Sequence, residues 1–305
     1  MAVTRAEPIG QIGQHKPKWG VPASLRMVLL VLPSAAMFFI FFIVPVMLLF
    51  AIAFNPSQSG VVKFEPEFSL ETFRRFFDRP LYYEALIRSI VLGITTAAVA
   101  LLFAYPLAYF VAKESRPGRI NLYMILILVS LQLDLIIRMY GMMVLLGDTG
   151  LINQALMRYG IISDPLPLMY NTFGVVVGLV QLTLPFMILS LIGIIQAINP
   201  ALEEAARSLG AGRWRTFFTV TLPLSMPGVL AGSLLVFAIA IGSYAVPVLM
   251  GGWRVIVTPM HIYQQIAEMG YWQFGAAISC MLFGVSLIAV FIYHRYTQKL
   301  IGGLV

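Results

Sequence analysis

Few side chains in this sequence have the spacing that enzyme chemistry requires. The three histidines, His15, His261 and His294, are far apart in the chain and lack the close spacing of a metal site. There is no glycine-rich phosphate loop ending in Lys-Ser or Lys-Thr, so we expect no ATP hydrolysis by this chain itself. Its single cysteine, Cys280, cannot form an internal disulfide. The sequence therefore predicts a protein that is not an enzyme and that needs no metal or cofactor.

The remaining polar residues of interest lie within apolar stretches, where they could line a path for a solute. Gln132, Asp134 and Arg138 interrupt the stretch from Ile120 to Leu146. A charge at membrane depth costs at least ~2.5 kcal/mol on insertion scales, so it usually marks a pathway or a charge pair. Two interpretations stay open, and both can hold. Either an Asp134–Arg138 salt bridge fixes helix packing, or the Asp134 carboxylate faces the path and helps a cationic solute to cross.

Two polar residues in later apolar stretches, Gln181 and Tyr244, are further candidates for the path. Hydrogen bonding between helices is the alternative role for each of them. Glycines that recur four residues apart favour close helix contact, which we interpret as packing. These glycines are Gly174, Gly178, Gly228 and Gly232.

The segment from 199 to 223 is the main polar interruption between two long apolar stretches. Asn199 is a good helix cap, Pro200 suits the first helical position, and Gly210 is where such a helix would end. Glu203 and Arg207 are four residues apart and can pair along one side. One narrow apolar face is formed by Leu202, Ala205, Ala206 and Leu209. The pattern predicts a short, exposed, amphipathic helix that a partner protein could contact.

The composition places this helix in a membrane protein. The chain has 305 residues, of which 60% are hydrophobic and 11% charged, and its mean hydropathy is +0.89. No water-soluble fold of this length could bury so much apolar surface. The apolar stretches are continuous rather than alternating, which favours an all-α integral membrane protein over a barrel. The net charge of +7 does not indicate nucleic-acid binding, because the basic residues are scattered among loops.

The hydropathy pattern predicts six transmembrane helices after a polar tail. Residues 1–25 are expected to be a disordered tail, and residues 26–305 the membrane domain. A polar, aromatic-rich segment at about 55–84 should lie outside the cytoplasm, with a short surface helix near Leu70–Phe77. The first span is expected to bend near Pro33 or Pro45. The six expected spans are about Met27–Phe54, Ser89–Val111, Ile120–Leu146, Phe173–Ile198, Val229–Met250 and Phe274–His294.

The loop charges predict the orientation. Basic residues clearly outnumber acidic ones in the loops that would be cytoplasmic if the N-terminus is inside, whereas the opposite loops are near balance. Both termini and the 199–223 segment are therefore expected in the cytoplasm. Arg213, Trp214 and Arg215 should lie at headgroup level, with the arginines near anionic membrane lipid. Pro223 and Pro227 are expected to end the helix that follows Arg215 and to turn the chain back into the membrane.

The same segment carries a resemblance. Glu204-Ala205-Ala206, then Gly210, then Val220 and Leu222-Pro223 resemble the EAA motif of ABC-importer permeases, with Val220 where the family usually has Ile. In that family this helix, between spans 4 and 5, is the coupling helix that docks on a cytoplasmic ATPase. The resemblance implies that Glu204 meets a basic residue of the ATPase, that Ala205 and Ala206 allow close approach, and that Gly210 permits the turn. Further ATPase-coupling residues implied are Glu203, Arg207 and Leu209.

Other strings resemble the spermidine/putrescine permease subunits of bacterial ABC importers. They are Ile137–Tyr140, Leu145–Asn153 and Trp272–Ala277, although Ser130, Gln132 and Asp134 depart from that pattern. The resemblance implies a permease of the bacterial inner membrane that forms the path for a small solute, foremost a polyamine. Implied partners are two ATP-binding ATPase subunits, a second permease that is a paralogue, and a periplasmic solute-binding protein. The alternatives are an ABC importer for another solute, such as an opine or iron, and an ion-gradient-driven transporter that uses Asp134.

Overall fold

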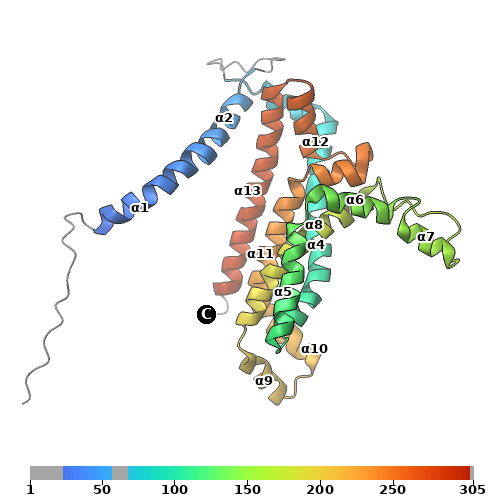
Figure 1. Cartoon of the computed structure of the whole chain (residues 1–305). Helices are drawn as coiled ribbons and strands as arrows, with labels where there is room; N and C mark the ends of the chain where they lie inside the picture. The colour runs from blue at the N-terminus through green and yellow to red at the C-terminus, as the bar shows by residue number, and fades with distance from the viewer. Residues whose placement is uncertain (1–22, 57–67, 303–305) are drawn as a thin grey trace, which may run out of the picture. The chain divides into compact units, whose positions relative to one another are not determined.

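The computed structural model describes residues 23–56 and 68–302, so most of the expected tail lies outside the described residues. Chain contacts divide the molecule into two units, Met1–Leu48 and Leu49–Val305. The elements (Figure 1) are α1 Ala23–Phe38, η1 Phe39–Ile43, α2 Val44–Ala53, α3 Glu71–Asp78, α4 Pro80–Ala112, α5 Pro117–Gln132, α6 Leu135–Leu146, α7 Leu151–Arg158, α8 Thr172–Ala197, α9 Pro200–Ser208, α10 Arg213–Thr216, η2 Phe217–Thr221, α11 Leu222–Ile241, η3 Pro247–Gly251, η4 Gly252–Arg254, α12 Thr258–Tyr263, η5 Gln264–Glu268 and α13 Trp272–Gly302.

In the first unit, the described chain is helical throughout. The α-helical pattern of α1 gives way to the π-helical turn η1 at Phe39–Ile43, shortly before Pro45, and α2 begins at Val44. Proline removes one backbone donor, so an irregular turn just before it is the expected local response. The large side chains in this stretch, such as Phe39 and Phe41, are exposed within the chain, as in a helix that meets lipid.

In the second unit, α4, α8 and α11 form the central bundle. Their close approach depends on glycine. A Cβ added to Gly232 of α11 would lie 2.6 Å from the sulfur of Met187 on α8, and one added to Gly228 would lie 3.0 Å from Ile194. The predicted packing role of these glycines is thus confirmed. Tyr105 of α4 and Ser225 of α11 share a buried hydrogen bond of 2.7 Å across the same bundle.

Two clusters of buried side chains fill this bundle. The first joins Ala100, Ala104 and Ala108 of α4 to Leu191 and Ile195 of α8. The second is formed where α6 and η3 cross α8, around the backbone of Gly178. It contains Met139, Val175, Leu179, Val246 and Met250. Alanine and glycine on one helix opposite large aliphatic side chains on the next give the close interdigitation of a membrane bundle.

Six helical stretches of the described chain are long and apolar enough to span a membrane, in agreement with the predicted number. They are Leu30–Ala53, Pro80–Ala112, Leu135–Arg158, Thr172–Ala197, Arg213–Ile241 and Trp272–Tyr293. The expected continuous span Ile120–Leu146 was wrong, because α5 ends at Gln132 and a new helix, α6, begins at Leu135. The stretch Leu135–Arg158 is itself two helices, α6 and α7, while the shorter apolar helix α5 packs against α4 and α8.

The segment before α4 contains the predicted surface helix. The structure places it at Glu71–Asp78, one residue from the expected bounds, as α3. Its inner face buries Phe76 against Tyr82 and Phe274, and the Arg75 guanidinium lies over the Phe274 ring, 4.5 Å from the centroid. Such a cation–π contact holds a charged group on an aromatic surface. α3 is therefore packed onto the starts of α4 and α13 rather than being a free linker.

Candidate functional site

The helix α9 has the start and the end that the sequence predicts. The Oδ1 atom of Asn199 accepts a hydrogen bond from the backbone N–H of Ala201 at 3.0 Å, and Pro200 is the first helical residue. At the other end Gly210 has φ +86°, a value that favours glycine. The N–H of Gly210 donates to Arg207 O at 2.9 Å and that of Ala211 to Ala206 O at 3.0 Å. This is the Schellman arrangement, so α9 is a short helix closed at both ends.

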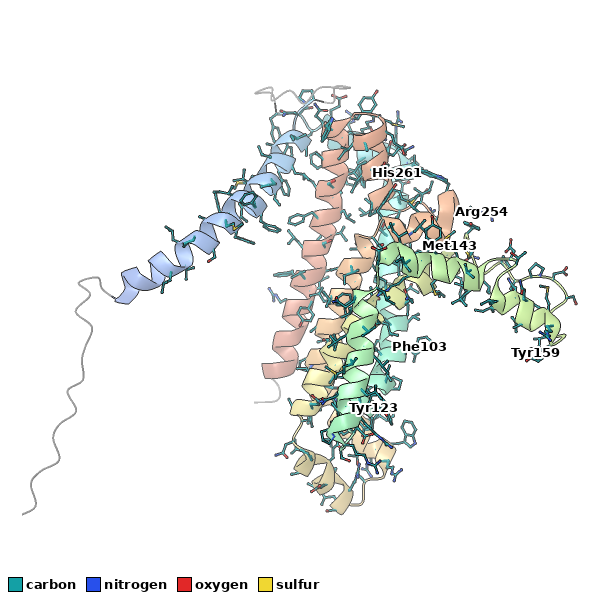
Figure 2. All side chains as sticks on the ribbon, in the orientation of Figure 1. Phe103, Tyr123, Met143, Tyr159, Arg254 and His261 are labelled. Atoms are coloured by element: carbon teal, nitrogen blue, oxygen red, sulfur yellow. The ribbon has the colours of Figure 1, made fainter. Side chains whose placement is uncertain are left out.

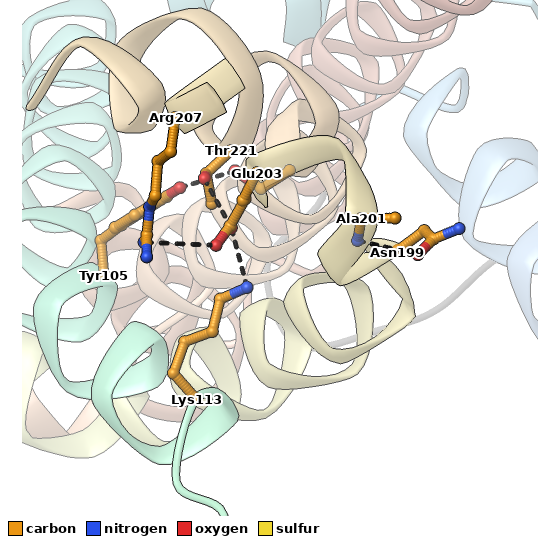
Figure 3. Close-up of polar contacts among 8 residues, drawn as sticks. Tyr105, Lys113, Asn199, Ala201, Glu203, Arg207 and Thr221 are labelled. Atoms are coloured by element: carbon orange, nitrogen blue, oxygen red, sulfur yellow. Dashed lines mark hydrogen bonds and ion pairs between the residues drawn. The ribbon is translucent and has the colours of Figure 1, made fainter. Parts of the chain in front are cut away.

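One side of α9 is attached to the bundle through Glu203. Its Oε1 atom lies 2.7 Å from Lys113 Nζ, at the end of α4, and accepts a hydrogen bond from Thr221 Oγ1 of η2 at 2.9 Å (Figure 3). Arg207 Nη2 is 4.0 Å from the other carboxylate oxygen. The predicted Glu203–Arg207 pair is present, but Lys113 is the closer partner. We call Glu203, Lys113 and Thr221 the inner anchor of α9.

The inner anchor keeps a buried carboxylate ionised. Burial alone would raise the pKa of Glu203. The hydrogen bonds from Lys113 and Thr221, with the positive charges of Lys113 and Arg207, outweigh burial and hold the pKa below its ordinary value of 4.5. A charged Glu203 at neutral pH therefore links α9, the end of α4 and η2 at one point.

The opposite side of α9 is exposed and largely apolar. Leu209 is 90% exposed and Leu202 is 48% exposed, and Glu204 and Ala205 are exposed beside them. We call these four residues the outer face of α9. A helix that turns its carboxylate inward and its leucines outward is reversed relative to an ordinary surface helix. An exposed apolar stripe of this kind is typical of a surface that another protein covers.

The helical stretch that leads from α9 back to the bundle is not interrupted at the prolines, although the sequence predicted an interruption there. α10, η2 and α11 follow one another directly from Arg213 to Ile241, and Pro223 and Pro227 lie within this continuous stretch. The prediction that the prolines end the helix was wrong, because Pro223 follows the π-helical turn η2 and sits at the start of α11, where its missing N–H is tolerated. Trp214 is 76% exposed and stacks on Phe218.

The charged residues of the expected path have different partners from those predicted. Asp134 caps α6: its Oδ1 accepts hydrogen bonds from the N–H groups of Ile136 at 2.8 Å and Ile137 at 3.3 Å. Arg138 is buried, and its Nη2 donates to the carbonyl oxygen of Ser130 on α5 at 2.9 Å. No Asp134–Arg138 salt bridge occurs among the ion pairs of the described residues. The helix is interrupted just before Asp134, and the Asp134 carboxylate turns toward the backbone of α6. The predicted Asp134–Arg138 salt bridge was therefore wrong.

The other path candidates are not gathered at one point. Gln132 is exposed at the end of α5, and Gln181 is half-buried on α8. Tyr244 is 36% exposed in the break between α11 and η3, where its ring lies 4.9 Å from that of Tyr263. Gln132, Asp134 and Arg138 thus lie at the α5–α6 junction, whereas Gln181 lies on α8 and Tyr244 follows α11.

Comparison with known proteins decides the family. Residues 23–302 match the family described as "Binding-protein-dependent transport system inner membrane component". The chain belongs to this family. It is a multi-pass protein of the inner membrane, and the family is a component of binding-protein-dependent transport systems, so the alternative of an ion-gradient-driven transporter is not supported.

Named relatives and solved structures agree with this assignment. The spermidine/putrescine transport system permease protein PotB of Escherichia coli is 36% identical over 233 residues, covering 76% of this chain and 84% of the relative. PotB of Haemophilus influenzae is 34% identical over 260 residues, covering 85% and 90%. A bacterial alginate ABC transporter has the same fold, with a TM-score of 0.68 and 18% identity over 90% of this chain and 96% of that one.

Several residues that shape the permease were missed from the sequence. Lys113 and Thr221 lie far from Glu203 in the chain, and no local pattern joins them. Asn153 is fully buried and holds the 147–166 segment, donating to Gly147 O at 3.1 Å and to Leu166 O at 3.0 Å and accepting from Leu166 N at 2.9 Å. An asparagine in a string of apolar residues was the one available signal for this contact.

Proposed function

We propose that this chain is the permease subunit of an ATP-driven importer for a polyamine, and that α9 is its coupling helix. The substrate class rests on the relatives whose printed names are spermidine/putrescine permeases. The coupling role rests on one observation: α9 is a closed helix whose inner side is anchored by Glu203 and whose apolar outer face is unpaired within the described chain. A short, anchored helix of this kind can transmit a displacement from one protein to another.

The orientation follows from the loop charges. With both termini in the cytoplasm, α9 lies on the same side as the ATPases, and the α3 and α12 end faces the periplasm. Two ATPase subunits then contact the α9 helices of this chain and of a paralogous second permease. A periplasmic binding protein delivers the solute at the opposite end. ATP hydrolysis belongs to the ATPase subunits, and this chain supplies the path.

On this proposal the residues of α9 divide into two groups. Glu204, Ala205 and Leu209 contact the ATPase, together with Ala206 and Arg207 at the edge of the outer face. Glu203 was expected among the contacts, but its carboxylate faces the bundle, so it positions the helix instead. Gly210 closes the helix and sets the direction of the chain beyond it.

Reconstitution of the complete transporter tests the proposal. We expect the polyamine-loaded binding protein to stimulate ATP hydrolysis by the assembled complex, and polyamine to enter the vesicles. Leu209→Asp and Glu204→Lys should reduce both activities strongly while the permease still inserts in the membrane. Ser208→Ala, on an exposed residue of the same helix, is the matched control and should leave both unchanged.

The outcomes separate the two parts of the proposal. Stimulation by another solute, with the same response to Leu209→Asp, would replace the substrate and keep the coupling role. Full uptake in both outer-face variants would refute the coupling role of α9.

A further inference from the structure

The irregular turn after α11 places two tyrosine rings in contact. α11 ends at Ile241, η3 begins at Pro247, and Tyr244 lies between them. Its ring is 4.9 Å from that of Tyr263, the last residue of α12, with an interplanar angle of 34°. Tyr244 is 36% exposed and Tyr263 is 47% exposed, so the pair has aromatic surface available to a ligand. Aromatic faces attract organic cations.

The orientation of α12 explains why Tyr263 is available. Residues two apart on an α-helix point to nearly opposite sides. His261, labelled in Figure 2, points inward and is only 3% exposed. Its ring lies 5.1 Å from that of Tyr82. α12 is fixed to α4 by Ser89, whose Oγ accepts a hydrogen bond of 2.9 Å from the N–H of Thr258. Tyr263 therefore lies on the exposed side of a helix that is hydrogen-bonded to α4.

The electrostatic surroundings of the pair are negative. η5 is π-helical and follows α12 directly, so Glu268, five residues after Tyr263, lies about one turn beyond it along the same helical segment. Glu268, at the end of η5, is exposed and takes part in none of the ion pairs found among the described residues. The C-terminal end of the 20-residue helix α11 lies next to Tyr244 and adds the negative pole of a helix dipole.

We propose that Tyr244, Tyr263 and Glu268 form an entry site for an organic ammonium ion. The site lies at the end of the bundle opposite α9 and α10 (Figure 1). It rests on the proposed function, because that end then faces the binding protein. The backbone is irregular at 242–244, and Gly242 and Tyr244 are exposed there, so this turn is open to a solute. Two rings and one carboxylate match a substrate with several ammonium groups linked by methylenes.

Cysteine chemistry in the complete transporter tests the site without assuming the substrate. The chain has one cysteine, so Cys280→Ala with Tyr244→Cys leaves a single thiol in this subunit. The probes are a trimethylammonium and a sulfonate methanethiosulfonate, and modification is measured by mass spectrometry of this subunit. Relative to a small thiol in water, we expect the cationic reagent to be favoured about three- to tenfold. Glu268→Gln should abolish this preference. The control Glu84→Gln removes an exposed carboxylate from a different element, α4, and should leave the preference unchanged.

Uptake measurements separate this inference from the proposed function. With Tyr263→Leu we expect a loss of polyamine uptake of at least about threefold, whereas Tyr263→Phe retains the ring and the uptake. A Tyr244→Cys variant whose thiol stays unmodified, or a charge preference that survives Glu268→Gln, would overturn the entry site even if the transporter imports polyamines. If the thiol reacts preferentially with the cationic reagent but the complex does not import polyamines, the entry site is supported and the polyamine assignment is refuted.

Discussion

Removal of the Glu203 carboxylate should release α9 from the bundle without unfolding the permease. The Glu203 side chain is 9% exposed and that of Lys113 is 29% exposed, with 2.7 Å between the charged atoms. Breaking a fully buried pair costs about 3–5 kcal/mol, and an exposed pair contributes about 0–1 kcal/mol. Because Lys113 can regain water once its partner is lost, we place the effect of Glu203→Ala between these limits, at about 1–3 kcal/mol.

Hydrogen exchange of the backbone measures this release directly. A loss of about 1–3 kcal/mol in local stability corresponds to roughly 5- to 150-fold faster exchange for the amides of α9. The amides of α8 should keep their protection, because the contact lies at the surface of the bundle. In the reconstituted transporter we expect ATP hydrolysis to continue in part while uptake falls, since the ATPase would push a helix that no longer moves α4 and η2.

A double-mutant cycle decides whether the pair itself is responsible. Lys113→Met and Glu203→Met together should cost less than the sum of the single changes, because each single change leaves a charge without its partner. Arg207→Met is the matched control: Arg207 is 4.0 Å from the same carboxylate and 53% exposed, so its loss should change exchange by no more than about 0.5 kcal/mol. Additive single effects, or exchange in α9 that does not respond to Glu203→Ala, would refute the inner anchor.

Three further results are expected. Gly210→Ala should destabilise the end of α9 by about 1 kcal/mol, measured by hydrogen exchange, because φ is +86° there, whereas Gly212→Ala should be neutral since Gly212 has φ −67° and open space around it. Asp134→Asn should preserve uptake because asparagine also caps helices, whereas Arg138→Met should lower the thermal stability of the complex by about 1–3 kcal/mol by leaving a carbonyl unpaired. The protection factors of the α9 amides, measured against intrinsic exchange at each pH, should be constant from neutral pH to about pH 5 and fall below 4.5, because the depressed pKa of Glu203 gives stability that is lost as the carboxylate gains a proton.

Local and compositional features of this fold could be predicted from the sequence. The ends of α9 were found because the cap at Asn199, the proline at 200 and the glycine at 210 act on their immediate neighbours. The number of spans follows from hydropathy, since the bilayer imposes the length of each apolar helix. Glycines four residues apart predicted faces of close contact, because the spacing alone places them on one side of a helix: Gly228 and Gly232 meet α8, and Gly178 meets the start of η3.

The candidate path could not be predicted because it depends on where a helix breaks. Asp134 and Arg138 pair only if one helix continues through them, and the backbone of Leu133 is extended, with φ −69° and ψ 132°. No proline or glycine marks that break, although an aspartate directly before an apolar helix is a known start signal. Lys113 was missed for a different reason: its partner Glu203 comes from a distant part of the sequence. Tyr263 was missed because its contact with Tyr244 depends on how the chain folds back between η3 and α12.

The two sites of this permease are connected through α11. Glu203 joins α9 to Thr221 in η2, which continues into α11, and the far end of α11 leads into the break that carries Tyr244. The 20 residues of α11 form a rod of about 30 Å. On the proposed function, a displacement of α9 that tilts α11 relative to α4 would change the position of Tyr244 relative to Tyr263, which α12 holds against α4. We therefore expect the motion that the inner anchor transmits to alter the proposed entry site.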